Sequence, residues 1–185
     1  MPIEITKDNV SKIFKSMAEL TGKAVYVGIP EDEASRTEEA EMNNARLGYI
    51  HEFGSPLANI PARPFLIPGV KNVEKETAAL LKVAAEAALS GDSKLADQNL
   101  NRAGIIAANE VKKVINSNIP PPLKPRTIRD RYKTRGTKGR RDNEILYMQL
   151  ITGGMEPEAA QTQAGIIALI DTGQLRNSIT YVVKK

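Results

Sequence analysis

The triplet Asp171-Thr172-Gly173 is the first candidate for chemistry in this sequence, because it follows a short apolar run as the catalytic strand of an aspartic protease does. Such a protease needs two aspartates that share one proton across a dimer or a pseudo-dimer. Gln174 also stands where that pattern expects a small residue. The alternative is that Asp171 or Thr172 accepts hydrogen bonds from the first N–H groups of a short helix. We predict this capping role, for which Asp171→Ala costs about 0.5–2 kcal/mol of stability.

The other side chains that commonly do chemistry occur in the wrong number or spacing. The chain has no cysteine, which excludes thiolate sites, and its single histidine, His51, cannot form a histidine metal cluster. His51 followed by Glu52 in an expected helix is more typical of a surface or interface histidine than of a catalyst. The adjacent acids Glu31, Asp32 and Glu33 lack the alternating spacing of a calcium loop, and no glycine-rich stretch ends in the GK[ST] of a phosphate loop. We therefore predict no catalytic residue, no metal site and no cofactor.

Composition limits the possible folds. A chain of 185 residues is long enough for one domain with a sizeable core. Aromatic residues make up 4% of it and tryptophan is absent, which favours a core of Ala, Ile, Leu and Val between helices and a small sheet. We find neither the roughly 18 consecutive apolar residues of a membrane span nor the pattern of a cleaved signal peptide, so we expect a soluble protein that is not exported by that route.

Positive charge is concentrated in one segment. Residues 124–141 contain nine Lys or Arg and one Asp, although the net charge of the chain is only +4. A basic loop of this kind can neutralise nucleic-acid phosphates, with Tyr132 available to stack on a base. It is equally suited to docking on an acidic protein surface or to remaining solvated. Because the cations show no recognition-helix pattern, we rank docking or solvation ahead of DNA contact.

The beginning of the chain predicts a helix and then a strand. Apolar residues at helical spacing mark residues 8–20 as an amphipathic helix, with Asp8 placed to cap its start. The β-branched run 23–29, stopped by Pro30, predicts a strand against which that helix can pack.

A second helix and an arm follow. Ser35 and Glu38 have capping-box spacing, which predicts a helix from about Thr37 to Phe53 with Gly54 at its end. Four prolines in residues 54–70 argue against a helix there and favour an extended arm. Such an arm must run over a surface or lie against a neighbouring subunit.

The second half of the chain is mainly helical. Two long helices, from Gly69 to Ser90 and from there to Pro120, predict an antiparallel hairpin that turns at Gly91. A short helix is predicted within 143–152, and another begins at Pro157.

The C-terminal segment is expected to form one helical turn, Gly173 to Ser178, and then a strand with Ile179, Tyr181 and Val183 on one face. The fold class is therefore α+β: a small, mostly antiparallel sheet packed against long helices, with an extended proline-rich arm and a basic loop.

Four segments carry a resemblance to a known family. They are, in order, the strand end VGIP, the helix end YIHEFGS, the arm IPARPFLIPGV and, after LKPRTIRDR, the terminal LIDTGQLRNSITYVV. Each segment alone is a weak signal, but their combination and order, from about Lys23 to Val183, are specific. The chain resembles the tail-completion (minor tail, head–tail joining or neck) proteins of long-tailed bacteriophages.

The resemblance implies a non-enzymatic structural protein of the virion, located at the head–tail junction and in the host cytoplasm during assembly. Such proteins form a homo-oligomeric ring, hexameric by this resemblance, which completes the tail and joins it to the head connector. The implied partners are further copies of the chain, the tail tube or terminator protein and the connector protein. DNA passes through the ring without sequence-specific binding, and no membrane is involved.

The arm and the basic segment are the expected sites of subunit contact. The candidate interface residues are Tyr49, Phe53, Pro61, Arg63, Pro64, Phe65, Leu66, Arg126, Arg129 and Arg131. The residues expected to form the C-terminal cap and strand are Asp171, Thr172, Gly173, Leu175 and Ile179.

One departure from the family pattern concerns residues 142–165, which separate the basic stretch from the terminal segment. We expect them to be a helical insertion within a single domain that spans residues 1–185. The alternative function is a nucleic-acid-binding module that uses segment 124–141. It predicts duplex-DNA affinity that falls with salt and is lost when Arg129, Arg131, Arg135 and Arg140 are neutralised.

Overall fold

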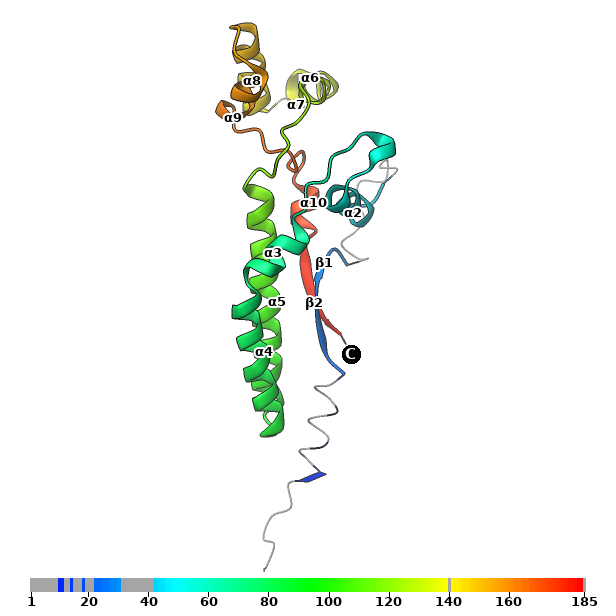
Figure 1. Ribbon diagram of the computed structural model, residues 1–185, viewed down its shortest axis with the longest axis vertical. Helices are drawn as coiled ribbons and strands as arrows, with labels where there is room; N and C mark the ends of the chain where they lie inside the picture. Colours follow the sequence, from blue (N-terminus) through cyan, green and yellow to red (C-terminus); the bar gives the residue numbers. More distant parts are fainter. Residues whose placement is uncertain are drawn as a thin grey trace, which may run out of the picture.

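The computed structural model describes residues 10, 11, 14, 18, 22–30, 42–139 and 141–184, except for the side chains at 137 and 138. A long helical hairpin, α4 (Glu74–Leu89) and α5 (Ser93–Asn116), runs beside a sheet of two strands, β1 (Ala24–Gly28) and β2 (Thr180–Lys184). A group of shorter helices lies beyond one end of the hairpin (Figure 1). The α+β class is confirmed, with a small antiparallel sheet packed against helices.

The turn of the hairpin lies at Gly91 and Asp92. Gly91 has a φ of 81°, a left-handed conformation that glycine adopts without strain. Asp92 then caps α5, since its carboxylate accepts a hydrogen bond of 2.9 Å from the Leu95 N–H. Buried alanines on both helices, including Ala87, Ala88 and Ala96, let the two backbones approach closely.

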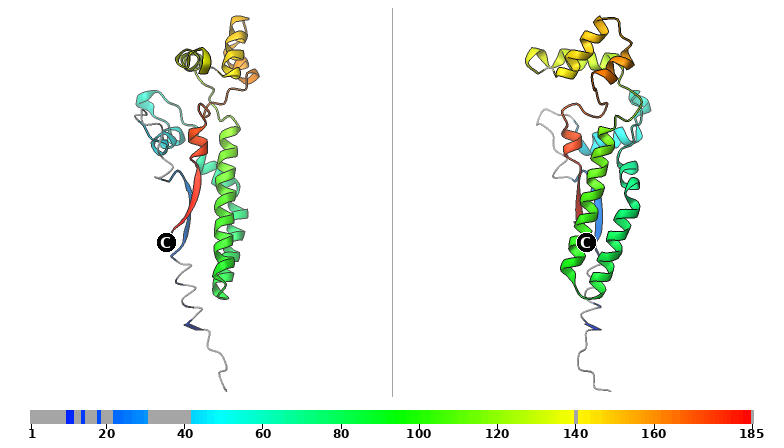
Figure 2. Two further views of the ribbon diagram at one scale, coloured as in Figure 1. Left: turned by 180° about the vertical axis from the view of Figure 1, so that it is seen from behind. Right: turned by 90° about the vertical axis from the view of Figure 1, so that its left-hand side faces the viewer.

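The sheet lies against α5. β1 and β2 pair antiparallel, with Val27 opposite Tyr181 and Tyr26 opposite Val182. The ring of Tyr181 packs directly over Gly104 of α5, where any larger residue would overlap it. The Tyr181 hydroxyl donates a hydrogen bond of 3.1 Å to the Asn101 side-chain oxygen. The sheet thus depends on α5 for the burial of its inner face (Figure 2).

The helix α2 (Asn44–Phe53) begins later than predicted. Asn43 caps it by accepting a 2.8 Å hydrogen bond from the Arg46 N–H, and Gly54 ends it as expected. The expected capping box at Ser35 lies outside the described residues. Most of the expected helix 8–20 does too, although residues 10, 11, 14 and 18 are helical where described.

The proline-rich arm is only partly extended. A 3₁₀ turn, η2 (Pro56–Ala58), and irregular backbone over 61–65 are followed by the helix α3 (Leu66–Asn72). The prediction of an arm up to residue 70 was therefore wrong after Phe65. Pro68 is the third residue of α3, a position whose N–H has no partner within the helix, so proline is tolerated there.

The basic segment is helical, and the prediction of a basic loop was wrong. α6 (Pro125–Thr134) begins with proline at its first position, and the short α7 (Gly136–Gly139) follows. Lys and Arg are good helix formers, and α6 buries Ile128 completely.

The helices α8 (Asp142–Thr152) and α9 (Pro157–Gln163) confirm the two short helices expected after the basic segment. Together with α6 and α7 they form what we call the helical lobe, which has a hydrophobic core of its own. The buried members of that core are Leu123, Ile128, Tyr147, Ala160, Ala164, Ile166 and Ala168. The description of residues 142–165 as an insertion remains a prediction.

The chain returns from the lobe to the sheet through a short helical turn, α10 (Gln174–Asn177). Leu169 and Ile179, on either side of this turn, pack with Phe65, Val111 and Ile115 in the second hydrophobic core, between the sheet, α3 and α5. The terminal segment therefore reaches the core that the arm also enters.

The contact between α5 and the sheet gives a direct test of this packing. We expect Gly104→Ala to lower the free energy of unfolding by about 1–3 kcal/mol, because the added methyl group overlaps the Tyr181 ring. Gly28→Ala is the control, since no atom lies within 4 Å of the added Cβ. Urea denaturation of both variants measures the difference, and equal stabilities would contradict the contact.

Candidate functional site

The helix α2, the arm, α6 and the terminal segment meet at one junction, and the first link in it is Glu52. This buried carboxylate, from YIHEFGS, accepts hydrogen bonds from the N–H groups of Phe65 at 2.7 Å, Leu66 at 2.8 Å and Ile67 at 3.0 Å. These N–H groups lie at the start of α3, where a helix has donors without partners and a partial positive charge. Glu52 therefore fixes the point at which the arm becomes a helix.

Arg63 forms the second link. Its side chain is buried and donates hydrogen bonds of 2.9 Å and 2.7 Å to the Pro121 carbonyl and one of 3.2 Å to the Pro122 carbonyl. These carbonyls belong to the proline run 120–122, which lies between α5 and the helical lobe. Arg63 therefore ties the arm to the base of the lobe and is not free for a subunit contact.

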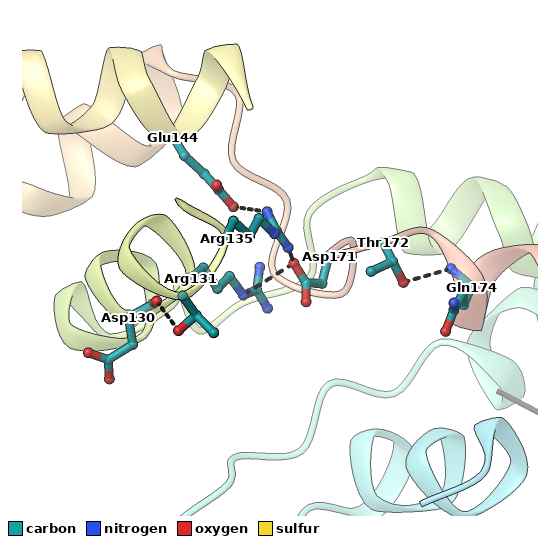
Figure 3. Close-up of polar contacts among 8 residues, drawn as sticks. Asp130, Arg131, Arg135, Glu144, Asp171, Thr172 and Gln174 are labelled. Atoms are coloured by element: carbon teal, nitrogen blue, oxygen red, sulfur yellow. Dashed lines mark hydrogen bonds and ion pairs between the residues drawn. The ribbon is translucent and has the colours of Figure 1, made fainter. Parts of the chain in front are cut away.

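The third link is an ion-pair network between α6 and the terminal segment (Figure 3). The Arg131 Nε lies 3.7 Å from the Asp171 Oδ1, and Arg135 forms ion pairs with both Asp171 and Glu144. Glu144, from α8, is buried. Burial and repulsion from Arg135 lower the pKa of Arg131, while Glu144 opposes that effect. Two half-buried guanidinium groups are thus paired with two carboxylates, of which Glu144 is buried and Asp171 is 43% exposed.

This network bears on both interpretations of the Asp171-Thr172-Gly173 triplet. Asp171 faces guanidinium groups, whereas an aspartic protease needs a second carboxyl group to share a proton. The expectation that Asp171 caps the following turn was also wrong. Thr172 is the acceptor, at 3.4 Å from the Gln174 N–H, and Gly173 occupies the cap position with a φ of 80°. Asp171 therefore joins the terminal segment to α6 by an ion pair, while Thr172 contacts the turn that follows.

His51 lies in a cleft of about 1250 Å³ between the arm, the proline run and the helical lobe. Burial, then the charges of Arg63 and Arg131, lower the pKa of His51 from 6.5 to about 4. The imidazole is therefore neutral at neutral pH. A histidine held neutral beside two arginines marks a region of positive potential.

An exposed aromatic pair lies on α2, close to the junction in sequence. Tyr49 and Phe53 are 67% and 56% exposed, and their rings contact each other with centroids 4.8 Å apart. Leu57, in η2, is fully exposed. Large apolar side chains that stay in water while the chain buries mostly aliphatic residues are typical of an interaction surface.

The structure divides the predicted interface residues into two groups. Phe65, Arg63 and Arg131 have their contacts inside the chain, and Leu66 packs against the core. The residues that remain at the surface are Tyr49, Phe53, Pro64, Arg126 and Arg129, while Pro61 is half-buried beside the cleft. Leu175, in α10, and Ile179, the residue before β2, are both buried.

Sequence reasoning missed the groups that hold the junction together. Glu52, Glu144 and Arg135 are far from their partners in sequence, and so are two amides. Gln161 pairs with both backbone groups of Leu123, at 2.9 Å and 2.7 Å, and Asn118 accepts a 3.0 Å hydrogen bond from the Ala168 N–H. One signal in the sequence could have indicated the role of Glu52. This acid lies just before an arm whose backbone groups need hydrogen-bond partners.

Within the part of the chain that the structure describes, no group of three or more His, Asp or Glu is arranged to hold a metal ion. Within the same described residues, no helix is both long enough and apolar enough to cross a membrane.

Comparison with known proteins does not assign the chain to a family. No family model matches it, and no solved structure does either. An uncharacterized protein of Methanocaldococcus jannaschii is 51% identical over 35 residues, which is 19% of this chain. The match spans 26% of that protein's own length.

The Asp171 network can be tested by a double-mutant cycle. We expect Asp171→Asn to lower the free energy of unfolding by about 1–3 kcal/mol, because it leaves two guanidinium groups short of a counter-charge. Its effect and that of Arg131→Ala should be non-additive by about 0.5–3 kcal/mol. Thermal and urea unfolding measure the cycle, with Thr172→Ala as the neighbouring control. Additive effects would contradict the pairing.

His51 gives a test by pH, which is clean because it is the only histidine. We expect its Cε1–H resonance to titrate with a midpoint of about 4 in the folded protein. Between pH 6.5 and 4 the unfolded chain binds a proton that the folded chain does not, so stability should fall as the pH falls through this window. His51→Gln should remove that component, and a folded-state midpoint near 6.5 would contradict the assignment.

Proposed function

We propose that this chain is a structural subunit of a phage neck or tail end, which assembles into a ring that completes the tail and joins it to the head connector. It acts by assembly, without catalysis, and leaves a channel for DNA. The observation that carries the proposal is the exposed Tyr49–Phe53 pair beside a junction in which the family-like segments hold one another.

The junction supports the proposal because it connects these segments to one another. Glu52 joins the helix end YIHEFGS to the arm, Arg63 joins the arm to the base of the lobe, and Asp171 joins the terminal segment to LKPRTIRDR. Segments that resemble a family in combination are thus in mutual contact. A rigid subunit of this kind is what a ring requires, because each copy must present the same surfaces.

The exposed side chains support the assembly part of the proposal. An aromatic pair contributes large contact area with little loss of conformational freedom, and aromatic residues are enriched in interfaces. In a ring each contact joins two different surfaces of neighbouring subunits, so the partner surface for Tyr49 and Phe53 lies elsewhere on the next copy.

A nucleic-acid-binding module is the second candidate, and one observation favours it. Arg126, Arg129 and Lys133 lie at helical spacing on the exposed side of α6, and such a stripe can contact phosphates. The structure also changes the residues that this candidate needs. Arg131 and Arg135 are paired with Asp171 and Glu144 of the same chain, so neutralising them would test folding and not DNA contact.

The test of the neck assignment is immunogold electron microscopy of tailed particles released by cells that carry the gene. We expect label at the head–tail junction. In parallel, Tyr49→Ser with Phe53→Ser should abolish incorporation and leave the free energy of unfolding nearly unchanged, because both side chains are exposed.

Leu81→Ser, which alters an exposed apolar residue of α4, is the matched control and should be incorporated normally. Particles that form without any label would overturn the proposal. Normal incorporation of the aromatic variant would remove Tyr49 and Phe53 from the interface.

A further inference from the structure

The two sides of α6 carry cations in different situations. On the inner side, Ile128 enters the core of the lobe, and Arg131 and Arg135 pair with Asp171 and Glu144. The cations on this side are therefore neutralised within the chain.

The outer side of α6 keeps a surplus of positive charge. Arg126, Arg129 and Lys133 are spaced three and four residues apart and are all exposed. Arg126, with a side chain 89% exposed, pairs with Asp130 at 3.6 Å. Among the described residues, Lys133 has no carboxylate within ion-pairing distance, and the Arg129 Nε donates only to the Pro125 carbonyl, at 3.4 Å. We call Arg126, Arg129 and Lys133 the outer basic stripe.

The sequence contains one segment of the opposite charge. Residues 31–41, EDEASRTEEAE, hold six carboxylates and one arginine. They lie between β1 and α2, outside the described residues. The chain thus carries both a concentrated acidic segment and an exposed basic helix face whose own acid, Asp130, offsets only part of its charge.

We propose that the acidic segment 31–41 of one copy docks on the outer basic stripe of a second copy. The contact is head-to-tail, because it joins two different parts of the same chain, and repeated head-to-tail contacts close a ring when the rotation allows. This inference rests on the proposed ring and names one of its interfaces. Charge complementarity selects the partner and the register, while the aromatic pair of α2 supplies apolar area elsewhere.

The charges also predict how the contact responds to salt. Each exposed ion pair is weak, so several must act together. Their interaction is screened over about 10 Å at 0.1 M ionic strength. Self-association should therefore weaken as sodium chloride is raised, unlike an interface made only of apolar side chains.

The experiment is a charge swap between two full-length variants. One variant carries Glu31→Lys, Asp32→Lys and Glu33→Lys, and the other carries Arg126→Glu, Arg129→Glu and Lys133→Glu. Sedimentation velocity over a range of concentrations measures association of each variant, of their mixture and of the chain that combines all six changes. The matched control is Lys71→Glu, Lys75→Glu and Lys82→Glu, which reverses three exposed lysines of α3 and α4.

We expect each swapped variant alone to associate at least about tenfold more weakly than the native chain, because like charges then meet. The mixture and the six-change chain should both recover association, and the control should behave as the native chain does. Circular dichroism of every variant checks that the fold is kept, since all of the described positions changed are exposed.

Four outcomes would overturn the proposal. Recovery in the six-change chain but not in the mixture would place the contact within one chain. Unaltered association of both swapped variants would show that this contact does not form. Failure of both the mixture and the six-change chain to recover association would show the same. Loss of duplex-DNA binding in the Arg126, Arg129 and Lys133 variant, with unaltered self-association, would assign the stripe to nucleic acid. Immunogold label at the head–tail junction alongside any of these results would leave the neck assignment in place.

Discussion

Glu52 carries its carboxylate into the interior of the protein, where it receives three N–H groups from the start of α3. Those donors arise because a helix leaves its first N–H groups without partners. The Phe65 bond is buried, and those of Leu66 and Ile67 are partly buried. A buried donor left unpaired costs about 1–3 kcal/mol, so one side chain satisfies a need that several residues create. Glu52 belongs to α2, and α3 follows the arm. The position of the arm relative to α2 therefore depends on this carboxylate.

The same principle, that buried polar groups need partners, explains the shape of the helical lobe. Arg131 and Arg135 can lie inward only because Asp171 and Glu144 meet them there. Asp171 comes from the segment that returns to the sheet, so the ion pairs join the lobe to the rest of the chain (Figure 3). The cations on the inner side of α6 therefore stabilise the fold, and only those of the outer basic stripe are available to a partner.

The residues of the junction and those of the surface have separate roles. Glu52, Arg63 and Asp171 are turned inward, where they hold the arm, α6 and the terminal segment together. Tyr49, Phe53 and Leu57 remain in water instead. Because the two sets of residues are separate, a change at the exposed aromatic pair leaves the internal links intact.

The sequence by itself determined the local elements. Helical spacing located α4 and α5, although it merged α4 with the end of α3 in one helix from Gly69. Gly91 marked the turn between α4 and α5, and the β-branched run 23–29 located β1. These features depend on neighbours within one or two turns of chain, which a pattern records directly. Only the tertiary structure decided the partners. That Glu52 caps α3, that Arg131 is held by an ion pair, and that Asp171 forms that pair and not a cap all depend on groups brought together by the fold, and no local spacing encodes them.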